Sequence, residues 1–445
     1  MRRKSPPRPA APAAAVALEI EKLVYGGDGL ARHDGVTYFV PFVLAGESIR
    51  ARPVDQRRNF VRAKLEEFLR VSPERVAPLC PYFTACGGCH YQHIPYPRQL
   101  EVKRDIVRET FARLGRLNWD GPVTLHGSEP FGYRNRAQWK VRPQPPRAAG
   151  TRGGLALGYF RAGSNQLCVV DECPVLAPPL AAALETFRAT LRSGALPESL
   201  REIEVFAEPS GSLLVNLTFS ALPDGPRRVA ERVRAAIPAA RSVLLRDTEG
   251  ERMELDGPGH LSYHARGTDY RVGHLSFFQV NRYLIEPMIE AVTSGPAQGL
   301  ALDLFAGVGL FSVPLGKRFE RVVAVEADPA AARDLEANLN AAGATAPRTI
   351  GAVNAEVARF LADWRETPDL VVLDPPRLGV PAEAIAALAK LRPGRILYVS
   401  CDPATLARDL RALAEAGFEI AELHLFDMFP QTYHIETLVH LTPKP

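Results

Sequence analysis

Five residues that could do chemistry stand at the ends of short apolar runs in the last third of the chain. Asp303 opens the glycine-rich run DLFAGVGLFS, and Glu326 ends the next apolar run. Asp374 leads DPPR, and Cys401 leads CDP directly after ILYVS. A cysteine just past a buried strand and near a helix start can be a nucleophile with a lowered pKa. Glu436 lies within apolar TYHIETLVHL, where a carboxylate is costly unless paired or functional, and a raised pKa would suit a general base or acid.

The glycine-rich run indicates a nucleoside cofactor. Glycines let the backbone approach a ligand, and the start of the following helix offers free N–H groups. Glu326 is placed to accept hydrogen bonds from ribose hydroxyls. Ser312 replaces the third glycine of the dinucleotide fingerprint, which favours S-adenosylmethionine (AdoMet) over NAD because AdoMet has no pyrophosphate to bind. A plain tight turn in an α/β core is the alternative interpretation.

Three cysteines lie close together in CPYFTACGGC, at Cys80, Cys86 and Cys89. Such spacing suits a metal or an iron–sulfur cluster, because thiolates must converge on one point. A fourth ligand is needed, and both Cys168 and Cys173 are candidates. Zinc would fit the same thiolate count. The lack of two C-x2-C pairs, which zinc ribbons have, favours the iron–sulfur cluster.

The composition is that of a globular protein with one unusual basic stretch. The chain has 445 residues, a formal net charge of +4 and 6 cysteines, too few for a disulfide scaffold, which indicates a reducing cytoplasm. No run of eighteen apolar residues is present, so no membrane helix is expected. The segment from Pro130 to Val170 has no acidic residue, which favours a nucleic-acid partner over a merely solvated face. Its basic residues are Arg134, Arg136, Lys140, Arg142, Arg147, Arg152 and Arg161.

The elements that must position these residues divide the chain into four expected parts. A disordered basic tail covers residues 1–14, and short strands with glycine turns predict a small closed β-barrel over 15–69. Residues 70–259 form a central α+β domain that carries the cysteines, with a helix expected at 98–116. Residues 260–445 alternate strand and helix, the pattern of a doubly wound α/β sheet. The strands expected there are 301–305, 322–326, 370–374, 396–400, 418–425 and 435–441.

Together these motifs resemble the AdoMet-dependent RNA uracil-5-methyltransferases over nearly the whole chain. The matching segments are CPYFTACGGC with DECPVL, SFFQVN, DLFAGVGLFS, DPPR, SCDPATLARDL and FPQTYHIETL. The resemblance implies a Rossmann-like class I methyltransferase domain, with the N-terminal barrel as an OB-like TRAM domain. Barrel and cysteines together are similar to the bacterial iron–sulfur subgroup that methylates 23S ribosomal RNA.

The resemblance also implies roles for single residues. Cys401 is the expected nucleophile, which adds to C6 of uracil so that C5 can attack the AdoMet methyl group, and Glu436 is the expected base for the C5 proton. Phe277 is expected near the target base. Leu310 stands where the family commonly has asparagine, which bears on one polar cofactor contact. The cofactor residues implied are Gln279, Phe305, Gly307, Glu326, Asn354 and Asp374, and the ligands implied for a [4Fe–4S] cluster are Cys80, Cys86, Cys89 and Cys173.

The expected partner is therefore RNA, 23S rRNA first, for a cytoplasmic monomer without a membrane anchor. Within the family, a tRNA uracil-5-methyltransferase is the alternative. Outside it, an NAD-dependent oxidoreductase would use the same glycines and Glu326 but leaves Cys401 and Glu436 unexplained. An amino-methyltransferase with a DPP loop would need no cysteine. A non-catalytic RNA-binding protein would keep the barrel and the basic surface without needing the reactive residues.

Overall fold

The computed structural model describes residues 14–144, 154–343 and 349–444, and these fall into two compact units. The first unit holds the chain up to Thr84, Cys89–Val102 and Gln431–Tyr433. The second holds Ala85–Gly88, Lys103–Pro430 and the chain from His434 onward. All but the last residue of the predicted basic tail lies outside the described residues. In the described part of the chain, no helix has both the length and the apolar character that crossing a bilayer requires.

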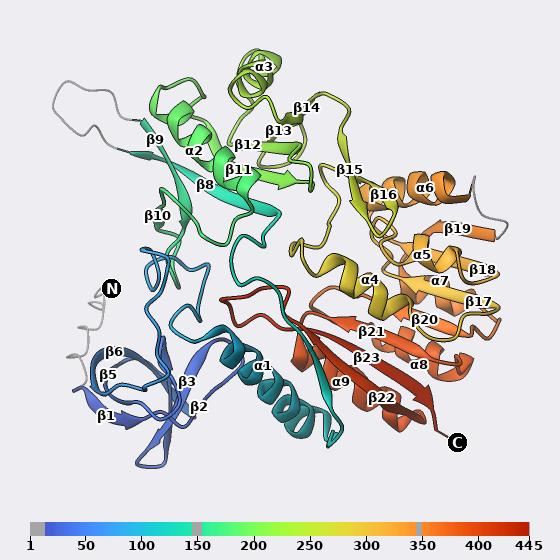
Figure 1. Cartoon of the computed structure of the whole chain (residues 1–445), viewed down its shortest axis with the longest axis horizontal. Helices are drawn as coiled ribbons and strands as arrows, with labels where there is room; N and C mark the ends of the chain where they lie inside the picture. The colour runs from blue at the N-terminus through green and yellow to red at the C-terminus, as the bar shows by residue number, and fades with distance from the viewer. Residues whose placement is uncertain (1–13, 145–153, 344–348, 445) are drawn as a thin grey trace, which may run out of the picture. The chain divides into compact units, whose positions relative to one another are not determined.

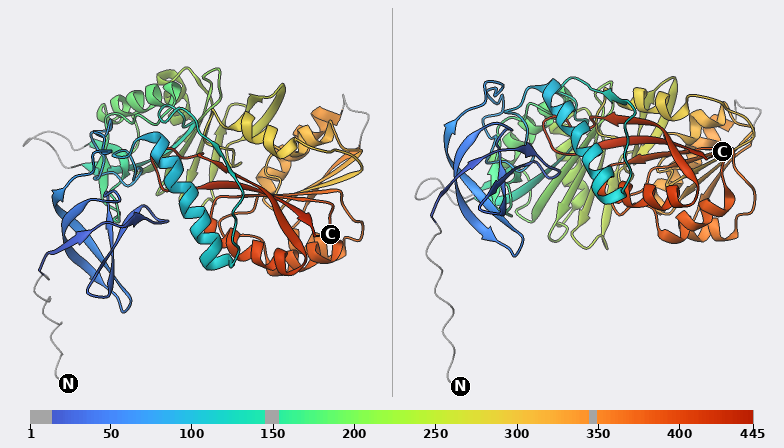
Figure 2. Two further views of the ribbon diagram at one scale, coloured as in Figure 1. Left: turned by 60° about the horizontal axis from the view of Figure 1, so that its bottom comes forward. Right: turned by 90° about the horizontal axis from the view of Figure 1, so that it is seen from below.

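The first unit is built on one curled sheet, a half-barrel (Figure 2). Its strands follow the order β1-β5-β6-β4-β3-β2 and curl around a core that includes Leu18, Val40 and Ile49. The strands β1 and β2 form the two edges of this sheet and are not paired with each other. The sheet therefore curls but does not close into the barrel predicted from the sequence. The strands are β1 (Val16–Glu19), β2 (Lys22–Leu23), β3 (Asp28–His33), β4 (Val36–Pro41), β5 (Ser48–Gln56) and β6 (Phe60–Arg70).

The second unit contains the predicted doubly wound sheet. It has eight strands in the order β19-β18-β17-β20-β21-β23-β22-β7, and β23 runs antiparallel to both its neighbours. The six strands expected from apolar runs are confirmed within one or two residues at each end, whereas β7 and β19 were not expected. The strands are β7 (Val123–His126), β17 (Leu300–Leu304), β18 (Arg321–Glu326), β19 (Thr349–Asn354), β20 (Leu370–Leu373), β21 (Ile396–Ser400), β22 (Phe418–Phe426) and β23 (Glu436–Pro443).

Helices cover both faces of this sheet. Figure 1 shows α4 and α6 on one side of the strands and α8 and α9 on the other. The helix α9 begins directly after Cys401 because the Asp402 side chain accepts hydrogen bonds from the amides of Ala404 and Thr405, and Pro403 suits the first turn. The helices are α4 (Ile285–Thr293), α5 (Ser312–Gly316), α6 (Pro329–Gly343), α7 (Val357–Asp363), α8 (Ala382–Leu391) and α9 (Pro403–Glu415).

A second sheet of seven strands and two helices forms the predicted α+β part. Its order is β10-β9-β8-β11-β12-β13-β14. The predicted helix at 98–116 is α1 followed by a π-helical turn, η1. The further elements are α1 (Tyr96–Thr110), η1 (Phe111–Gly115), β8 (Arg136–Gln144), β9 (Gly154–Phe160), β10 (Leu167–Val169), α2 (Pro178–Arg192), β11 (Leu200–Ala207), β12 (Leu213–Phe219), α3 (Pro226–Ala236), β13 (Ala240–Asp247), β14 (Met253–Asp256), β15 (His260–Ala265) and β16 (Thr268–Gly273).

Part of the basic stretch lies on β8, where acidic residues of the neighbouring strand β11 pair with it. The antiparallel register places Glu202 opposite Lys140, and their side chains form an ion pair. Arg136 pairs with Glu204 at 3.2 Å and is largely buried. The stretch itself contains no acidic residues, and the acids that pair with it lie on the neighbouring strand β11. Arg147 and Arg152 lie outside the described residues.

Candidate active site

A pocket of about 790 Å³ lies at the carboxyl ends of the parallel strands, inside the second unit. Ligands bind at this edge of doubly wound sheets, because the loops that follow the strands meet there. The pocket brings together the predicted nucleophile, the predicted base and most of the predicted cofactor residues. Of the predicted residues, Phe277, Gln279, Phe305, Gly307, Glu326, Asp374, Cys401 and Glu436 line it.

The glycine-rich loop is held in shape by Glu326. One carboxylate oxygen of Glu326 accepts a 2.8 Å hydrogen bond from the Gly307 amide, and the other accepts one of 2.7 Å from the Asp328 amide. Gly307 and Gly309 have φ of 57° and 90°, in the left-handed region that favours glycine. A Cβ on Gly309 would also come within 2.8 Å of Leu335. The loop therefore needs these glycines, and Glu326 both faces the pocket and supports the loop.

Two buried aspartates carry unusual proton affinity. Burial raises the pKa of Asp303 to about 7, although the Ser312 hydroxyl donates a hydrogen bond to its carboxylate. Burial also raises the pKa of Asp374 to about 7, and the negative charges of Asp303 and Glu326 raise it further. Three carboxylates thus lie near one another at one end of the sheet, where their negative charges raise the pKa values of Asp303 and Asp374 in addition to burial. The pocket suits a ligand with positive charge.

Cys401 and Glu436 face the same pocket from β21 and β23, but the thiol differs from the expectation. Burial, together with the charges of Glu436 and Asp374, raises the pKa of Cys401 to about 12, whereas a lowered value was predicted. The positive charge of Arg377 favours the thiolate but does not outweigh these effects. Burial raises the pKa of Glu436 well above its ordinary value, and Asp374 raises it further, as an acid–base residue requires.

Asn354 is the one predicted cofactor residue that the pocket does not include. It ends β19 beside Glu326, and its side-chain amide donates to the backbone carbonyls of Glu326 and Ala327. Glu356 and Val357, at the start of the next helix, line the pocket instead. The sequence reasoning also missed Arg377 and His434, whose side chains approach to 3.3 Å. Arg377 stands within the DPPR motif, so its charge was a visible signal.

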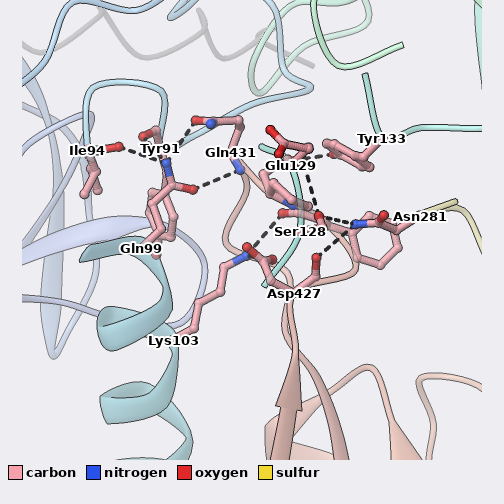
Figure 3. A network of polar contacts seen from close by, with 12 residues as sticks. Tyr91, Ile94, Gln99, Lys103, Ser128, Glu129, Tyr133, Asn281, Asp427 and Gln431 are labelled. Carbon is pink, nitrogen blue, oxygen red and sulfur yellow. Dashed lines mark hydrogen bonds and ion pairs between the residues drawn. The ribbon is translucent and has the colours of Figure 1, made fainter. Parts of the chain in front are cut away.

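Buried polar contacts hold the segment that leads to Glu436 (Figure 3). Lys103 of α1 donates to the Asp427 carboxylate at 2.6 Å and to the Phe429 carbonyl at 3.1 Å, and both ionic side chains are fully buried. Asn281 donates to the Asp427 carbonyl at 3.2 Å, and the Tyr133 hydroxyl to the Pro430 carbonyl at 3.1 Å. The backbone of Asp427–Pro430 is therefore fixed on both sides.

The segment around Phe277 is anchored by its neighbours. Ser276 donates to Asp334 at 2.6 Å, and Asn135 donates to the Gln279 carbonyl at 3.0 Å. Between these anchors the Phe277 side chain is 62% exposed, while Gln279 is buried. An exposed aromatic ring on a fixed backbone at a pocket mouth can stack on a base.

The cysteines can be compared within each unit. In the second unit, the backbone of Cys86 forms an isolated β-bridge with Arg161, just beyond β9. The Tyr159 hydroxyl of β9 donates a hydrogen bond to the Cys173 sulfur at 3.9 Å. The Gly88 amide donates to the Cys86 sulfur at 3.4 Å, a contact that a thiolate ligand accepts. Cys168 is buried within β10. In the first unit, the Cys80 amide donates to Gln92 at 2.9 Å.

Comparison with known proteins shows the family of this chain. The model of the tRNA (uracil-5-)-methyltransferase family matches residues 95–444. The chain is 34% identical to the 23S rRNA (uracil(1939)-C(5))-methyltransferase RlmD of Pseudomonas putida, over 95% of this chain and 92% of that protein. It is 33% identical to the RlmD of Shewanella amazonensis, over 95% and 94%.

Among solved structures, the chain is similar to the Pyrococcus abyssi tRNA (uracil-54, C5)-methyltransferase in complex with S-adenosyl-L-homocysteine. The TM-score is 0.73 at 24% identity, over 96% of this chain and 100% of that one. This likeness shows the shared fold. The family match and the curated relatives together show that the chain belongs to the S-adenosylmethionine-dependent RNA uracil-5-methyltransferases.

Proposed function

We propose that this enzyme methylates C5 of a uridine in 23S rRNA through a covalent bond between Cys401 and C6. The observation that carries the proposal is the meeting of Cys401, Glu436, Asp374 and Glu326 in one pocket. The curated relatives named for 23S rRNA support the ribosomal substrate. A tRNA uridine is the second candidate, favoured by the description of the family model. We further propose a monomer that works in the cytoplasm.

The proposed reaction balances at each step. The Cys401 thiolate adds to C6 of uracil, and C5 gains enolate-like electron density. C5 would then attack the methyl carbon of AdoMet, so that the C5–methyl bond forms, the methyl–sulfur bond breaks, and S-adenosylhomocysteine leaves. The Glu436 carboxylate takes the C5 proton, the C6–sulfur bond breaks, and the C5–C6 double bond and the thiolate are restored. The target base must leave its stack to reach the pocket, which costs least in a loop or single strand.

The cofactor roles follow the pocket. Glu326 would accept hydrogen bonds from the ribose hydroxyls, while Phe305 and Gly307 would border the cofactor at the turn. Gln279 and Asp374 would lie near the methionine end, and Phe277 beside the uracil. Asn354 is kept as an adenine-side residue through its position beside Glu326. The sulfonium charge of AdoMet would be stabilised by the carboxylates of Asp374 and Glu326.

We also propose that Cys80, Cys86, Cys89 and Cys173 hold a [4Fe–4S] cluster. The amide donor to the Cys86 sulfur and the hydroxyl donor to the Cys173 sulfur support thiolates at these two positions. Cys168, which is buried within β10, is not part of the proposed set. The cluster lies outside the methyl-transfer scheme, so its expected role is to order the chain or position RNA.

Methyl transfer to defined transcripts tests the proposed substrate. Purified enzyme and radiolabelled AdoMet are incubated with 23S rRNA fragments and with tRNA, and 5-methyluridine is located by mass spectrometry. Label at one uridine of the rRNA and none in tRNA is expected, with no transfer by Cys401→Ala. Label in tRNA alone would favour the second candidate, and full activity of Cys401→Ala would overturn the covalent route.

A further inference from the structure

Three histidines and a glutamate gather on one face of the sheet where β7, β22 and β23 run side by side. The Glu422 carboxylate lies 3.2 Å from His424 Nε2 and 3.6 Å from His440 Nδ1. His126 Nε2 lies 3.0 Å from the other ring nitrogen of His424. None of these residues lines the pocket described above. The cluster is therefore a separate chemical feature of the second unit.

The strand pattern itself brings these side chains together. Glu422 and His424 are two residues apart on β22. Because successive side chains of a strand point to opposite faces of the sheet, both project from the same face. The ladder between β22 and β23 has a bulge between Ile420 and Glu422, after which Glu422 lies directly opposite His440. Without the extra residue, Glu422 would shift by one position and point to the other face. The bulge thus aims the carboxylate at the imidazoles.

The spacing matches the coordination sphere of a small divalent ion. An ion that binds four ligands at about 2.1 Å in a tetrahedron separates those ligands by about 3.4 Å. The two contacts of the Glu422 carboxylate, 3.2 and 3.6 Å, lie on either side of that value. One ligand atom from each of Glu422, His424 and His440 lies within 4.8 Å of the other two. We propose that these three residues bind Zn²⁺ or a related divalent transition-metal ion.

The surroundings of the three ligands fit this role. When His424 Nε2 faces the ion, the proton is on Nδ1, which donates a hydrogen bond to His126. This hydrogen bond fixes the tautomer and the ring orientation of His424. The Glu422 side chain is 61% exposed, so the ion can enter from solvent, and water can complete its coordination.

The position of the cluster separates it from methyl transfer. His440 lies four residues beyond Glu436 on β23, about 13 Å along a strand at ~3.3 Å per residue. An ion there would cross-link β22 to β23, the strand that carries Glu436. The expected function is structural support for this part of the sheet.

Cobalt and zinc binding to the full-length, anaerobically purified protein tests the proposal after treatment with a chelator. Co²⁺ bound by nitrogen and oxygen gives visible d–d absorption without the intense charge-transfer bands of thiolate ligation, so binding to the cysteines is recognised. One such Co²⁺ per chain is expected, displaced by Zn²⁺. Glu422→Gln and His440→Ala should each abolish the signal, and His126→Ala should weaken Zn²⁺ binding about 10–100-fold.

His264→Ala is the matched control. His264 pairs with Asp269 at 2.9 Å on the exposed hairpin β15–β16, so its loss removes a histidine–carboxylate pair without touching the cluster. The control should bind like wild type. Glu422→Gln changes an exposed side chain by one atom type and should stay folded by circular dichroism. A wild-type protein without the d–d signal, or a signal unchanged in both Glu422→Gln and His440→Ala, would overturn the proposal.

Discussion

At the level of single residues, the surroundings of the Cys401 thiol disfavour the thiolate. Only the thiolate is a nucleophile, and burial together with the charges of Glu436 and Asp374 raises the pKa of Cys401 to about 12. A bound sulfonium cation would oppose the carboxylates that raise this pKa, so we expect the thiol to be activated when the cofactor binds.

Alkylation of Cys401 checks this electrostatic account. At pH 8, iodoacetamide should modify Cys401 slowly in the wild type. Asp374→Asn should speed the reaction up to about tenfold, because one pKa unit changes the thiolate fraction tenfold. The difference should vanish near pH 6, where Asp374 itself is protonated, since its pKa is about 7. Arg377→Gln removes the opposing positive charge and should slow the reaction. Peptide mass spectrometry measures the rate in each of the three proteins. Equal rates in all three proteins would contradict the account.

Glu436→Gln separates the base from the nucleophile. Cys401 can still add to C6 and the methyl group can still reach C5, but the C5 proton stays and elimination stalls. A methylated protein–RNA adduct should accumulate and survive a denaturing gel. RNA with 5-fluorouridine should trap the wild type in the same way, because fluorine cannot leave as a cation, and Cys401→Ala should trap nothing. Normal turnover by Glu436→Gln would move the base elsewhere, with Asp374 next.

At the level of elements, the buried pair of Lys103 and Asp427 ties α1 to the segment ahead of Glu436. Breaking one partner of a fully buried pair leaves an uncompensated charge, so Lys103→Met should destabilise the protein by about 3–5 kcal/mol. The double variant Lys103→Met, Asp427→Leu removes both charges and should recover most of that loss. Chemical denaturation of both variants and of Asp427→Leu completes the cycle. Purely additive losses would show that the pair is not coupled.

The strands were predictable because each is an apolar run of about five residues that ends at a polar one. The runs before Glu326, Asp374 and Cys401 are buried on both faces, so parallel strands could be inferred, and their carboxyl ends had to share an edge. The strand β19, TIGAVN, was missed because it contains a glycine and is only partly buried, so its sequence lacks the continuous apolar run that marks the other strands. Strand β7 was missed because it has only four residues and lies far in sequence from the other strands of the sheet. Nothing in those four residues indicates that they pair with β22.

The site residues were predictable from their types, but their electrostatics were not. The sequence places an aspartate, a cysteine and a glutamate at strand ends, and says nothing of how deeply each is buried. The pKa of Cys401 is raised, opposite to the prediction, because the thiol is buried and because Glu436, on the neighbouring strand β23, adds a negative charge in the same pocket. Likewise, the sequence did not show that acidic residues of β11 would pair with the basic residues of β8.

At the level of the whole molecule, the buried carboxylates make the stability of the ligand-free protein depend on pH. The pKa of Asp303 is raised from 3.8 to about 7, so its stabilising effect is complete below pH 3.8 and is lost as the pH rises to about 7. Asp303→Asn keeps an acceptor for Ser312 and does not ionise. Its stability relative to the wild type should rise by about a few kcal/mol between pH 5 and 8. Denaturation at several pH values measures this, and a difference that is constant with pH would refute it.

Iron content tests the proposed cluster, whose four cysteines lie between positions 80 and 173. Anaerobically purified protein should be brown and carry about four irons per chain. Cys173→Ser should lose the colour, because its sulfur accepts a hydrogen bond from Tyr159 and is partly accessible. Cys168→Ser is the matched control, since Cys168 is only 3% exposed and packs within β10, so iron should be retained. Colourless protein with one zinc on the cysteines would overturn the cluster, and iron loss in Cys168→Ser alone would exchange the roles of the two cysteines.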